Sequence, residues 1–285
     1  MKVARPRSSR HEMSNKAEKK NDARRNESLK RFFEASVQEL RPTDLGSHIS
    51  ILFMPAQHGG PPADFFGSVL SSAELSRAER FKAIADKVGF LQRRAFRRFC
   101  GAIALGVSRP LSQVDFATMG KGRPYLPALP RTWFSFSSCR NGYLAAWSSS
   151  SAIGVDIEHP EQAVLPDDMA SFHFAPNELD TVRNAEVDER KRLFLRLWTL
   201  KEAGLKSVGE GMSYGLKAFQ FETMPSVRVS FAPAEYGGPN NFDARLLEIA
   251  GCCAALVIRN RLQGRPQQSP EALIADQDKT IIGAS

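Results

Sequence analysis

The chain has 285 residues, 42% of them hydrophobic, so it can form one large domain or two modest ones. No stretch approaches the roughly 20 apolar residues that a membrane-spanning helix needs. The first 30 residues lack the apolar segment of a secretory signal, and the four cysteines fit neither a disulfide framework nor a zinc site. We therefore expect a cytoplasmic protein that does not bind membranes.

The net charge of +8 is concentrated near the N-terminus. Residues 1–30 carry ten Lys or Arg and four Asp or Glu, which leaves 29 basic and 27 acidic groups in the remainder. This segment has hardly any large apolar residue and is not expected to fold alone. It could be a nucleic-acid-binding arm, a disordered extension, or the result of an upstream start codon with Met13 as the true start. We expect a disordered basic extension over residues 1–45, and the near-neutral remainder disfavours nucleic acid as a partner.

Ordered structure is predicted to begin near Ile49, where HISILFMPA has the pattern of a strand. Residues 70–106 have helical spacing of apolar residues, and the Gly- and Pro-rich segment GKGRPYLPALP follows as a connector. TWFSFSSC, GYLAAWS and AIGVDIE are then predicted strands. A hairpin between the last two would place Asp156 and Glu158 near a strand end.

The second half loosely repeats this scheme. ERKRLFLRLWTLKEAGLKSVGEG is predicted to be a helix that ends at Gly209 and Gly211, and GLKAFQFE, VRVSFAP and CCAALVIR are predicted strands. We predict an α+β fold with two pseudo-symmetric halves, residues 46–152 and 153–262, and the acidic strand at their junction. Residues 263–285 are expected to form a loose C-terminal tail.

The strand AIGVDIE alternates strictly between two faces, and one face carries the residues Gly154, Asp156 and Glu158. Carboxylates about 7 Å apart along a strand repel each other unless a cation or a proton lies between them. Carboxylate oxygens are hard ligands that suit Mg²⁺. The helix LWTLKEAGLK offers a third acid, Glu202, on the same face as Lys206. Taken singly, the two patterns are more typical of a charged strand end and a solvated helix face than of a metal site.

The order of these motifs resembles that of the 4′-phosphopantetheinyl transferases. GVDIE is followed after about forty residues by WTLKEAGLK and then by GEGMSYGL, as in the monomeric two-lobed type that activates surfactin synthetase. LSRAERFKAI, GRPYLP and FSFSSC extend the resemblance over residues 70–260. It implies a monomer that uses Mg²⁺ to transfer the phosphopantetheine group of coenzyme A to a serine of an acyl, polyketide or peptidyl carrier protein. Adenosine 3′,5′-bisphosphate would be released.

The resemblance also implies roles for individual residues. Asp156, Glu158 and Glu202 would bind the metal, and Glu202 or Glu178 would help to deprotonate the serine, directly or through water. The phosphate contacts and the coenzyme A contacts would come from Lys201, Lys206, Arg77, Arg80, Arg123, Ser137 and Ser138. The family usually has a histidine where this chain has Ser138, and Arg140 is a candidate substitute.

Two other classes of protein share some of these features. A Mg²⁺-dependent nuclease or phosphodiesterase also needs clustered acids and a lysine, but its common Glu-x-Lys pattern is absent here because Ala203 and Gly204 follow Glu202. A non-catalytic nucleic-acid-binding protein would depend on the basic N-terminal segment alone.

Overall fold

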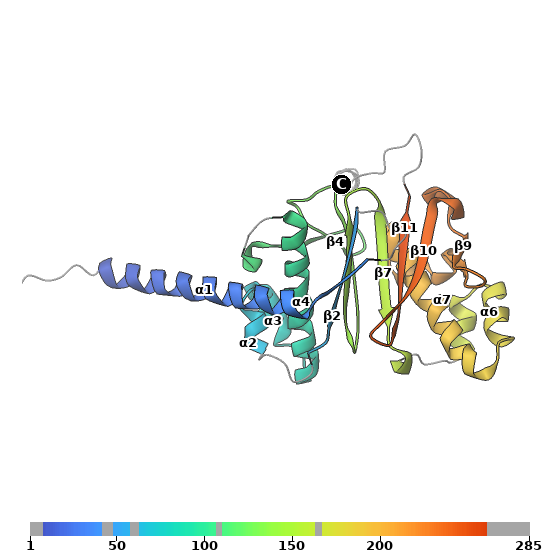
Figure 1. The fold of residues 1–285 in the computed structure, drawn as a ribbon, viewed down its shortest axis with the longest axis horizontal. Coiled ribbons are helices and arrows are strands. Elements are labelled where there is room, and N and C mark those ends of the chain that lie inside the picture. Colours follow the sequence, from blue (N-terminus) through green and yellow to red (C-terminus); the bar gives the residue numbers. More distant parts are fainter. Residues whose placement is uncertain (1–7, 42–47, 58–62, 107–109, 163–166, 261–285) are drawn as a thin grey trace, which may run out of the picture. The chain divides into compact units, whose positions relative to one another are not determined.

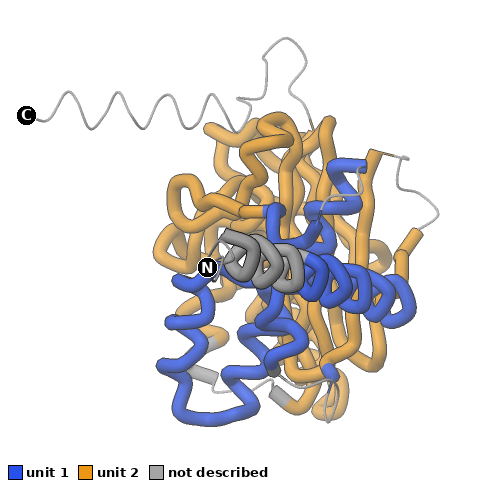
Figure 2. Tube along the Cα trace, turned by 90° about the vertical axis from the view of Figure 1, so that its left-hand side faces the viewer, with its two compact units in different colours: residues 1–36, 57–114 blue, residues 37–56, 115–285 orange. Residues whose placement is uncertain are grey.

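The computed structural model describes residues 8–41, 48–57, 63–106, 110–162 and 167–260. The chain divides into two compact units (Figure 2). Unit 1 comprises residues 1–36 and 57–114, and unit 2 comprises residues 37–56 and 115–285. Among the described helices, none is both long enough and apolar enough to cross a membrane.

Unit 1 is helical in its described part. Its elements are α1 (Ser8–Ser36), α2 (Ala63–Gly67), α3 (Ser72–Ala78), α4 (Ile84–Leu105) and the 3-10 helix η1 (Leu111–Gln113). A capping box begins α3, because Ser71 and Glu74 each bond the backbone N–H of the other. A left-handed glycine, Gly106, ends α4. The predicted helical region of residues 70–106 is therefore two helices.

The structure differs from the expected disordered extension, because α1 occupies most of that segment (Figure 1). Leu29 and Phe33, near the end of α1, are completely buried. The Phe33 ring stacks on Phe99 of α4 with 4.9 Å between the ring centroids. The basic composition of residues 1–30 conceals this anchor, since most of its apolar residues come after position 28. The parts of the expected extension at 1–7 and 42–45, and the expected tail at 263–285, lie outside the described residues.

Unit 2 contains all the strands of the described chain. They are β1 (Gln38–Leu40), β2 (Ile49–Pro55), β3 (Ala117–Met119), β4 (Arg123–Tyr125), β5 (Trp133–Cys139), β6 (Gly142–Ser148), β7 (Ala152–Glu158), β8 (Gln220–Glu222), β9 (Arg228–Phe231), β10 (Phe242–Ile249) and β11 (Cys252–Arg259). Its helices are α5 (Asp167–His173), α6 (Pro176–Arg183) and α7 (Val187–Val208). Its 3-10 turns are η2 (Pro160–Gln162), η3 (Met212–Tyr214), η4 (Leu216–Ala218), η5 (Ala234–Tyr236) and η6 (Pro239–Asn241).

Two antiparallel sheets and one long helix form the layers of unit 2. The first sheet has the order β1-β2-β6-β5 and the second has the order β10-β11-β7. Ile153, Val155 and Ile157 of β7 pack with Phe53 and Leu144 in a core shared by both sheets. Helix α7 covers the opposite face of the second sheet, where Leu197 and Leu200 form a second core with β10 and β11 (Figure 1).

The α+β fold class is confirmed, but two features of the topology were not foreseen. GYLAAWS does not form a hairpin with AIGVDIE: β6 pairs with β5 and β2, whereas β7 pairs with β11. The Ser148 hydroxyl accepts bonds from the N–H groups of Ser150 and Ser151, and this turn leads the chain from one sheet to the other. The compact units also divide the chain differently from the predicted halves, because the core between the sheets joins β2, β5 and β6 to β7 in unit 2.

Candidate active site

Gly154 allows α7 to lie directly against β7. A Cβ atom added to Gly154 would lie 2.0 Å from the carbonyl oxygen of Ala203 and 2.4 Å from the amide nitrogen of Ser207. Only a residue without a side chain leaves room for this contact between helix and strand backbones. The contact places the last two turns of α7 beside the acidic end of β7, which explains why the face that carries Asp156 and Glu158 begins with glycine.

We expect Gly154→Ala to destabilise the protein by about 1–3 kcal/mol or more, since the added methyl group meets backbone atoms that cannot rotate away. Gly211→Ala is the matched control, because no atom lies within 4 Å of its added Cβ. Urea denaturation of the two variants measures the difference. Equal midpoints for the two variants would contradict this account of the helix–strand contact.

Asp156 is the central acid of the site and is only 1% exposed. Its Oδ1 atom accepts a hydrogen bond of 2.7 Å from the hydroxyl of Ser137 and one of 2.6 Å from the Nζ atom of Lys206. Lys206 also donates to the Ser137 hydroxyl at 3.1 Å and lies 3.6 Å from Glu202. Three elements, β5, β7 and α7, thus converge on one carboxylate.

The charges of the site do not balance. Asp156, Glu158 and Glu202 supply three carboxylates, and Lys206 supplies one ammonium group. Burial, then repulsion by Asp156 and Glu202, raises the pKa of Glu158 to about 7. Burial and Asp156 likewise raise the pKa of Glu202. Burial alone would lower the pKa of Lys206, but the surrounding carboxylates outweigh this effect and raise it.

These residues fit a divalent cation in charge and in donor chemistry. The Oδ2 atom of Asp156 is buried and has no hydrogen-bond partner among the described residues, which is costly for a carboxylate oxygen unless a cation completes its surroundings. Hard carboxylate oxygens are the ligands that Mg²⁺ prefers. Within the described residues, the side chains as placed do not form a ready-made group of three metal ligands.

Lys201 and Glu178 are separated from this cluster. Both are buried, with side-chain exposures of 0% and 1%, and they form an ion pair of 2.6 Å. Lys201 also donates to the carbonyl oxygens of Leu216 and Phe219. Glu178 accepts from two backbone N–H groups, at the start of α6 and in β8. In this structure the pair ties α6, α7 and β8 together and is not open to a phosphate or a serine, contrary to the expectation from the sequence.

Arg123 also differs from its expected role. It is 9% exposed, its guanidinium lies 4.5 Å from the ring centroid of Trp133, and it donates to the carbonyl oxygens of Ile153 and Ser207. Burial lowers its pKa to about 9. Arg123 thus joins β4, β7 and α7 instead of facing solvent as a free phosphate ligand.

Four other residues predicted to contact coenzyme A lie elsewhere on the chain. Arg77 and Arg80 are exposed residues of unit 1, at α3 and just after it. Ser138 is exposed and, because strand side chains alternate, lies on the opposite face of β5 from Ser137. Arg140 forms an exposed ion pair of 2.6 Å with Glu161. Their roles in binding coenzyme A stay predictions.

The comparisons with known proteins agree on one family. The sequence model of the 4′-phosphopantetheinyl transferase superfamily matches residues 152–255, the segment that contains β7 and α7. Over this segment the chain is similar to the superfamily, and so are its relatives. A putative 4′-phosphopantetheinyl transferase of Synechocystis is 34% identical over 53% of this chain and 61% of its own length. HetI, a 4′-phosphopantetheinyl transferase of Nostoc, is 29% identical over 60% of this chain and 73% of its own length.

A third relative, a 4′-phosphopantetheinyl transferase of Bacillus subtilis, is 31% identical over 41% of this chain and 51% of its own length. The match thus covers between about half and three quarters of the length of these relatives. The segment that matches the superfamily brings Asp156, Glu202 and Lys206 together and leaves Lys201 on the far side of α7. The phase of the helix decides this, since adjacent residues point about 100° apart.

Two further residues support the site, and the sequence assigned neither of them a role. The side chain of Trp198 hydrogen-bonds Glu158 and Glu202 and so moderates the rise in the pKa of each. The spacing of four residues between Trp198 and Glu202 predicts this shared face of α7, which also carries Lys206. The hydroxyl of Ser135 accepts a hydrogen bond of 2.9 Å from the amide of Val155 and fixes β5 against β7. No sequence pattern indicated that contact.

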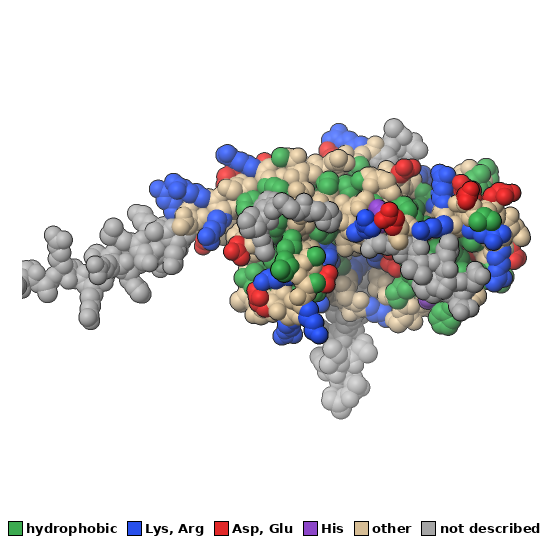
Figure 3. All heavy atoms as spheres, turned by 90° about the horizontal axis from the view of Figure 1, so that it is seen from below, with side chains coloured by type: hydrophobic (Ala, Val, Ile, Leu, Met, Phe, Trp, Pro, Cys, Tyr) green, Lys and Arg blue, Asp and Glu red, His purple; other side chains and the backbone are tan. Residues whose placement is uncertain are grey.

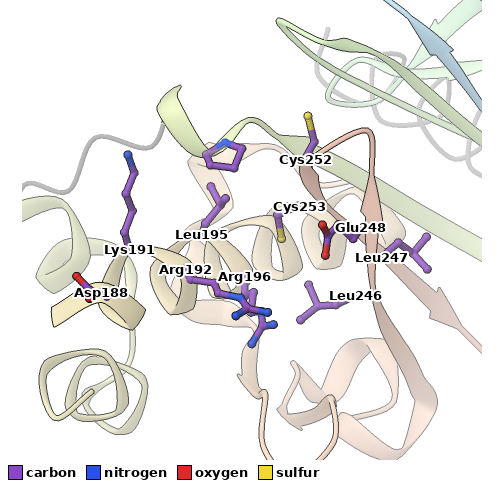
Figure 4. Close-up of a pocket in the computed structure, with 12 residues that line it drawn as sticks. Asp188, Lys191, Arg192, Leu195, Arg196, Leu246, Leu247, Glu248, Cys252 and Cys253 are labelled. Atoms are coloured by element: carbon purple, nitrogen blue, oxygen red, sulfur yellow. The ribbon is translucent and has the colours of Figure 1, made fainter. Parts of the chain in front are cut away.

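A pocket of about 600 Å³ lies between the first half of α7 and the β10–β11 hairpin (Figure 4). Its charged and apolar lining comes from Asp188, Lys191, Arg192, Arg196, Leu195, Leu246 and Glu248. Cys253 also lines it and lies opposite Glu158 in the register of β11 and β7. The pocket therefore borders the acidic end of β7.

Proposed function

We propose that the protein transfers the 4′-phosphopantetheine group of coenzyme A to a serine of an acyl, polyketide or peptidyl carrier protein, with Mg²⁺ as cofactor. The observation that carries the proposal is the convergence of Asp156, Glu158, Glu202 and Lys206 within the segment that matches the superfamily. In the reaction, the serine oxygen bonds to the β-phosphorus of coenzyme A. The pyrophosphate bond breaks, and adenosine 3′,5′-bisphosphate leaves.

The residues of the site suit the charges that this reaction creates. Bound to Asp156, Glu158 and Glu202, Mg²⁺ would stabilise the negative charge on the pyrophosphate. Lys206 would add a positive charge beside the same oxygens and orient Asp156 through its 2.6 Å contact. Glu202 is the better candidate for accepting the serine proton, since it lies in the acidic cluster beside Lys206 whereas Glu178 is occupied by Lys201.

The experiment is transfer from a fluorescent coenzyme A analogue to a panel of acyl, polyketide and peptidyl carrier domains in the presence of Mg²⁺. We expect at least one carrier to gain the label and the phosphopantetheine mass. The same carrier with its acceptor serine changed to alanine is the control and should stay unlabelled. If Mg²⁺ is present and every carrier remains unmodified, the proposal is wrong.

The face of the molecule seen in Figure 3 gives little support to the nuclease and nucleic-acid-binding alternatives. Basic and acidic side chains are interspersed on the face of the molecule seen in Figure 3, whereas a nucleic-acid site needs a basic stripe. Cleavage of single- or double-stranded DNA or RNA with Mg²⁺, lost on substitution of Asp156, would favour the nuclease instead.

We expect Mg²⁺ binding to weaken as the pH falls from 8 to 6. The Glu158 carboxyl has a pKa of about 7 without metal and must lose its proton to act as a ligand. This pKa lies above the usual 4.5, so the metal-free protein becomes less stable as the pH rises from about 4.5 toward 7. A bound cation would offset this loss of stability, because it favours the ionised carboxylate.

Titration calorimetry in two buffers of different ionisation enthalpy measures both the affinity and the proton released. Glu158→Gln should flatten the pH dependence, while Glu248→Gln, at an exposed position of β10, should preserve it. An affinity that is unchanged between pH 6 and 8 in the wild type would contradict the prediction.

A further inference from the structure

Cys139 and Cys252 face each other across the two sheets of unit 2. Cys139 is the last residue of β5 and Cys252 is the first residue of β11, 113 positions later in the chain. Their sulfur atoms lie 3.5 Å apart; Cys252 belongs to the core that the two sheets share, and Cys139 packs against it. Cys139 is partly exposed, whereas Cys252 is 1% exposed.

The two cysteines lie nearly as close as in a disulfide, but their sulfur atoms are not bonded. A disulfide has about 2.05 Å between its sulfur atoms, so the pair must close by only about 1.5 Å to form the bond. Both residues are at strand ends, next to turns at residues 140–141 and 250–251, where small backbone shifts disturb few ladder hydrogen bonds.

We propose that Cys139 and Cys252 form a reversible disulfide when the protein is exposed to a peroxide. The two cysteines would then be a redox modification site beside the candidate active site. The Cys139 sulfur attacks one peroxide oxygen, the O–O bond breaks, and a first water leaves with the formation of a sulfenic acid. The Cys252 sulfur then attacks the Cys139 sulfur, the S–O bond breaks, and a second water leaves. Two thiols are oxidised, hydrogen peroxide is reduced, and a dithiol reverses the bond.

The surroundings of the two thiols assign their roles. Burial, and then the contact with Cys139, raises the pKa of Cys252 to about 12, so Cys252 stays a thiol until its partner has reacted. The partly exposed Cys139 is the one that a peroxide reaches. Cys253 is the neighbouring alternative, but its side chain points to the opposite side of β11, into the pocket (Figure 4).

The bond would act on the site through β5. Ser137, which donates to Asp156, is two residues before Cys139 on the same face of the strand. A covalent link from Cys139 to β11 would fix the end of β5, and with it the Ser137 hydroxyl, against the second sheet. The modification stands on the geometry of the thiols and does not depend on the proposed transfer reaction.

The test is peptide mapping of the full-length protein after treatment with one to a few equivalents of hydrogen peroxide. Free thiols are alkylated, and trypsin is used without reductant. Cleavage at Arg131, Arg140, Arg245 and Arg259 releases residues 132–140 with Cys139 and residues 246–259 with Cys252 and Cys253. We expect these two peptides to be joined, the wild type to lose two of its four free thiols, and dithiothreitol to restore both.

Two kinds of variant identify the pair. Cys139→Ser and Cys252→Ser should each abolish the joined peptide, and the matched neighbour Cys253→Ser should retain it. A fully alkylated Cys139 in the oxidised wild type would overturn the proposal, and so would a link that disappears in Cys253→Ser. The wild-type map decides the question even if a variant folds poorly.

Discussion

Asp156→Asn should lower kcat/KM for phosphopantetheine transfer by more than about a hundredfold. The change keeps the shape of the side chain but removes its negative charge, which faces Lys206 at 2.6 Å. It also replaces one carboxylate oxygen by an amide nitrogen, so the buried oxygen that has no partner among the described residues is no longer available to a metal. Substitution of a group that only orients a metal ligand lowers metal affinity or activity by about 10–100-fold, and substitution of a direct ligand should lower it further. Turnover is measured over a series of Mg²⁺ concentrations, since partial recovery at high Mg²⁺ is expected if the residue is a ligand.

The loss should not come from unfolding. Asparagine can still accept the hydrogen bond from Ser137, and Lys206 retains Glu202 at 3.6 Å. Asp243→Asn is the matched control, because Asp243 is an exposed strand aspartate whose contact is with Asn260. Circular dichroism of both variants checks the fold. Near-wild-type turnover of Asp156→Asn at low millimolar Mg²⁺ would exclude Asp156 from the metal site.

The sequence predicts the local elements of this site well, because their signals are periodic. The alternation of AIGVDIE puts Asp156 and Glu158 on one face of β7, and the spacing of WTLKEAGLK puts Glu202 and Lys206 on one face of α7. The strict alternation also places Gly154 on the face that meets the helix. These features depend on neighbours within one turn or one strand.

The unforeseen features depend on residues far apart in the chain. Nothing near Arg123 indicates that the carbonyl oxygens of Ile153 and Ser207 will accept its hydrogen bonds. The partner of β7 is β11, about a hundred residues later, so a local hairpin was the natural but incorrect expectation. The segment FDARLLEI, which forms β10, was not predicted, because its charged residues break the apolar alternation. Such contacts follow from the assembled sheets and not from any short pattern.

The buried ion pair of Lys201 and Glu178 gives the second large effect. We expect Lys201→Met to destabilise the protein by about 3–5 kcal/mol, because it leaves the Glu178 carboxylate buried without its counter-charge. Glu178→Gln should cost a similar amount, since the Lys201 ammonium keeps only two carbonyl partners. Urea denaturation measures both free energies of unfolding.

The double variant Lys201→Met/Glu178→Leu separates a structural pair from a catalytic one. If the two groups stabilise each other, the double variant should lose much less stability than the sum of the single changes, because no charge remains buried. Lys217→Met, at an exposed lysine of η4, is the control and should stay near the wild type. Transfer measured well below each unfolding midpoint should then be largely retained. A Lys201→Met protein of normal stability with a strongly raised KM for coenzyme A would instead make Lys201 a phosphate ligand, as the family resemblance implies.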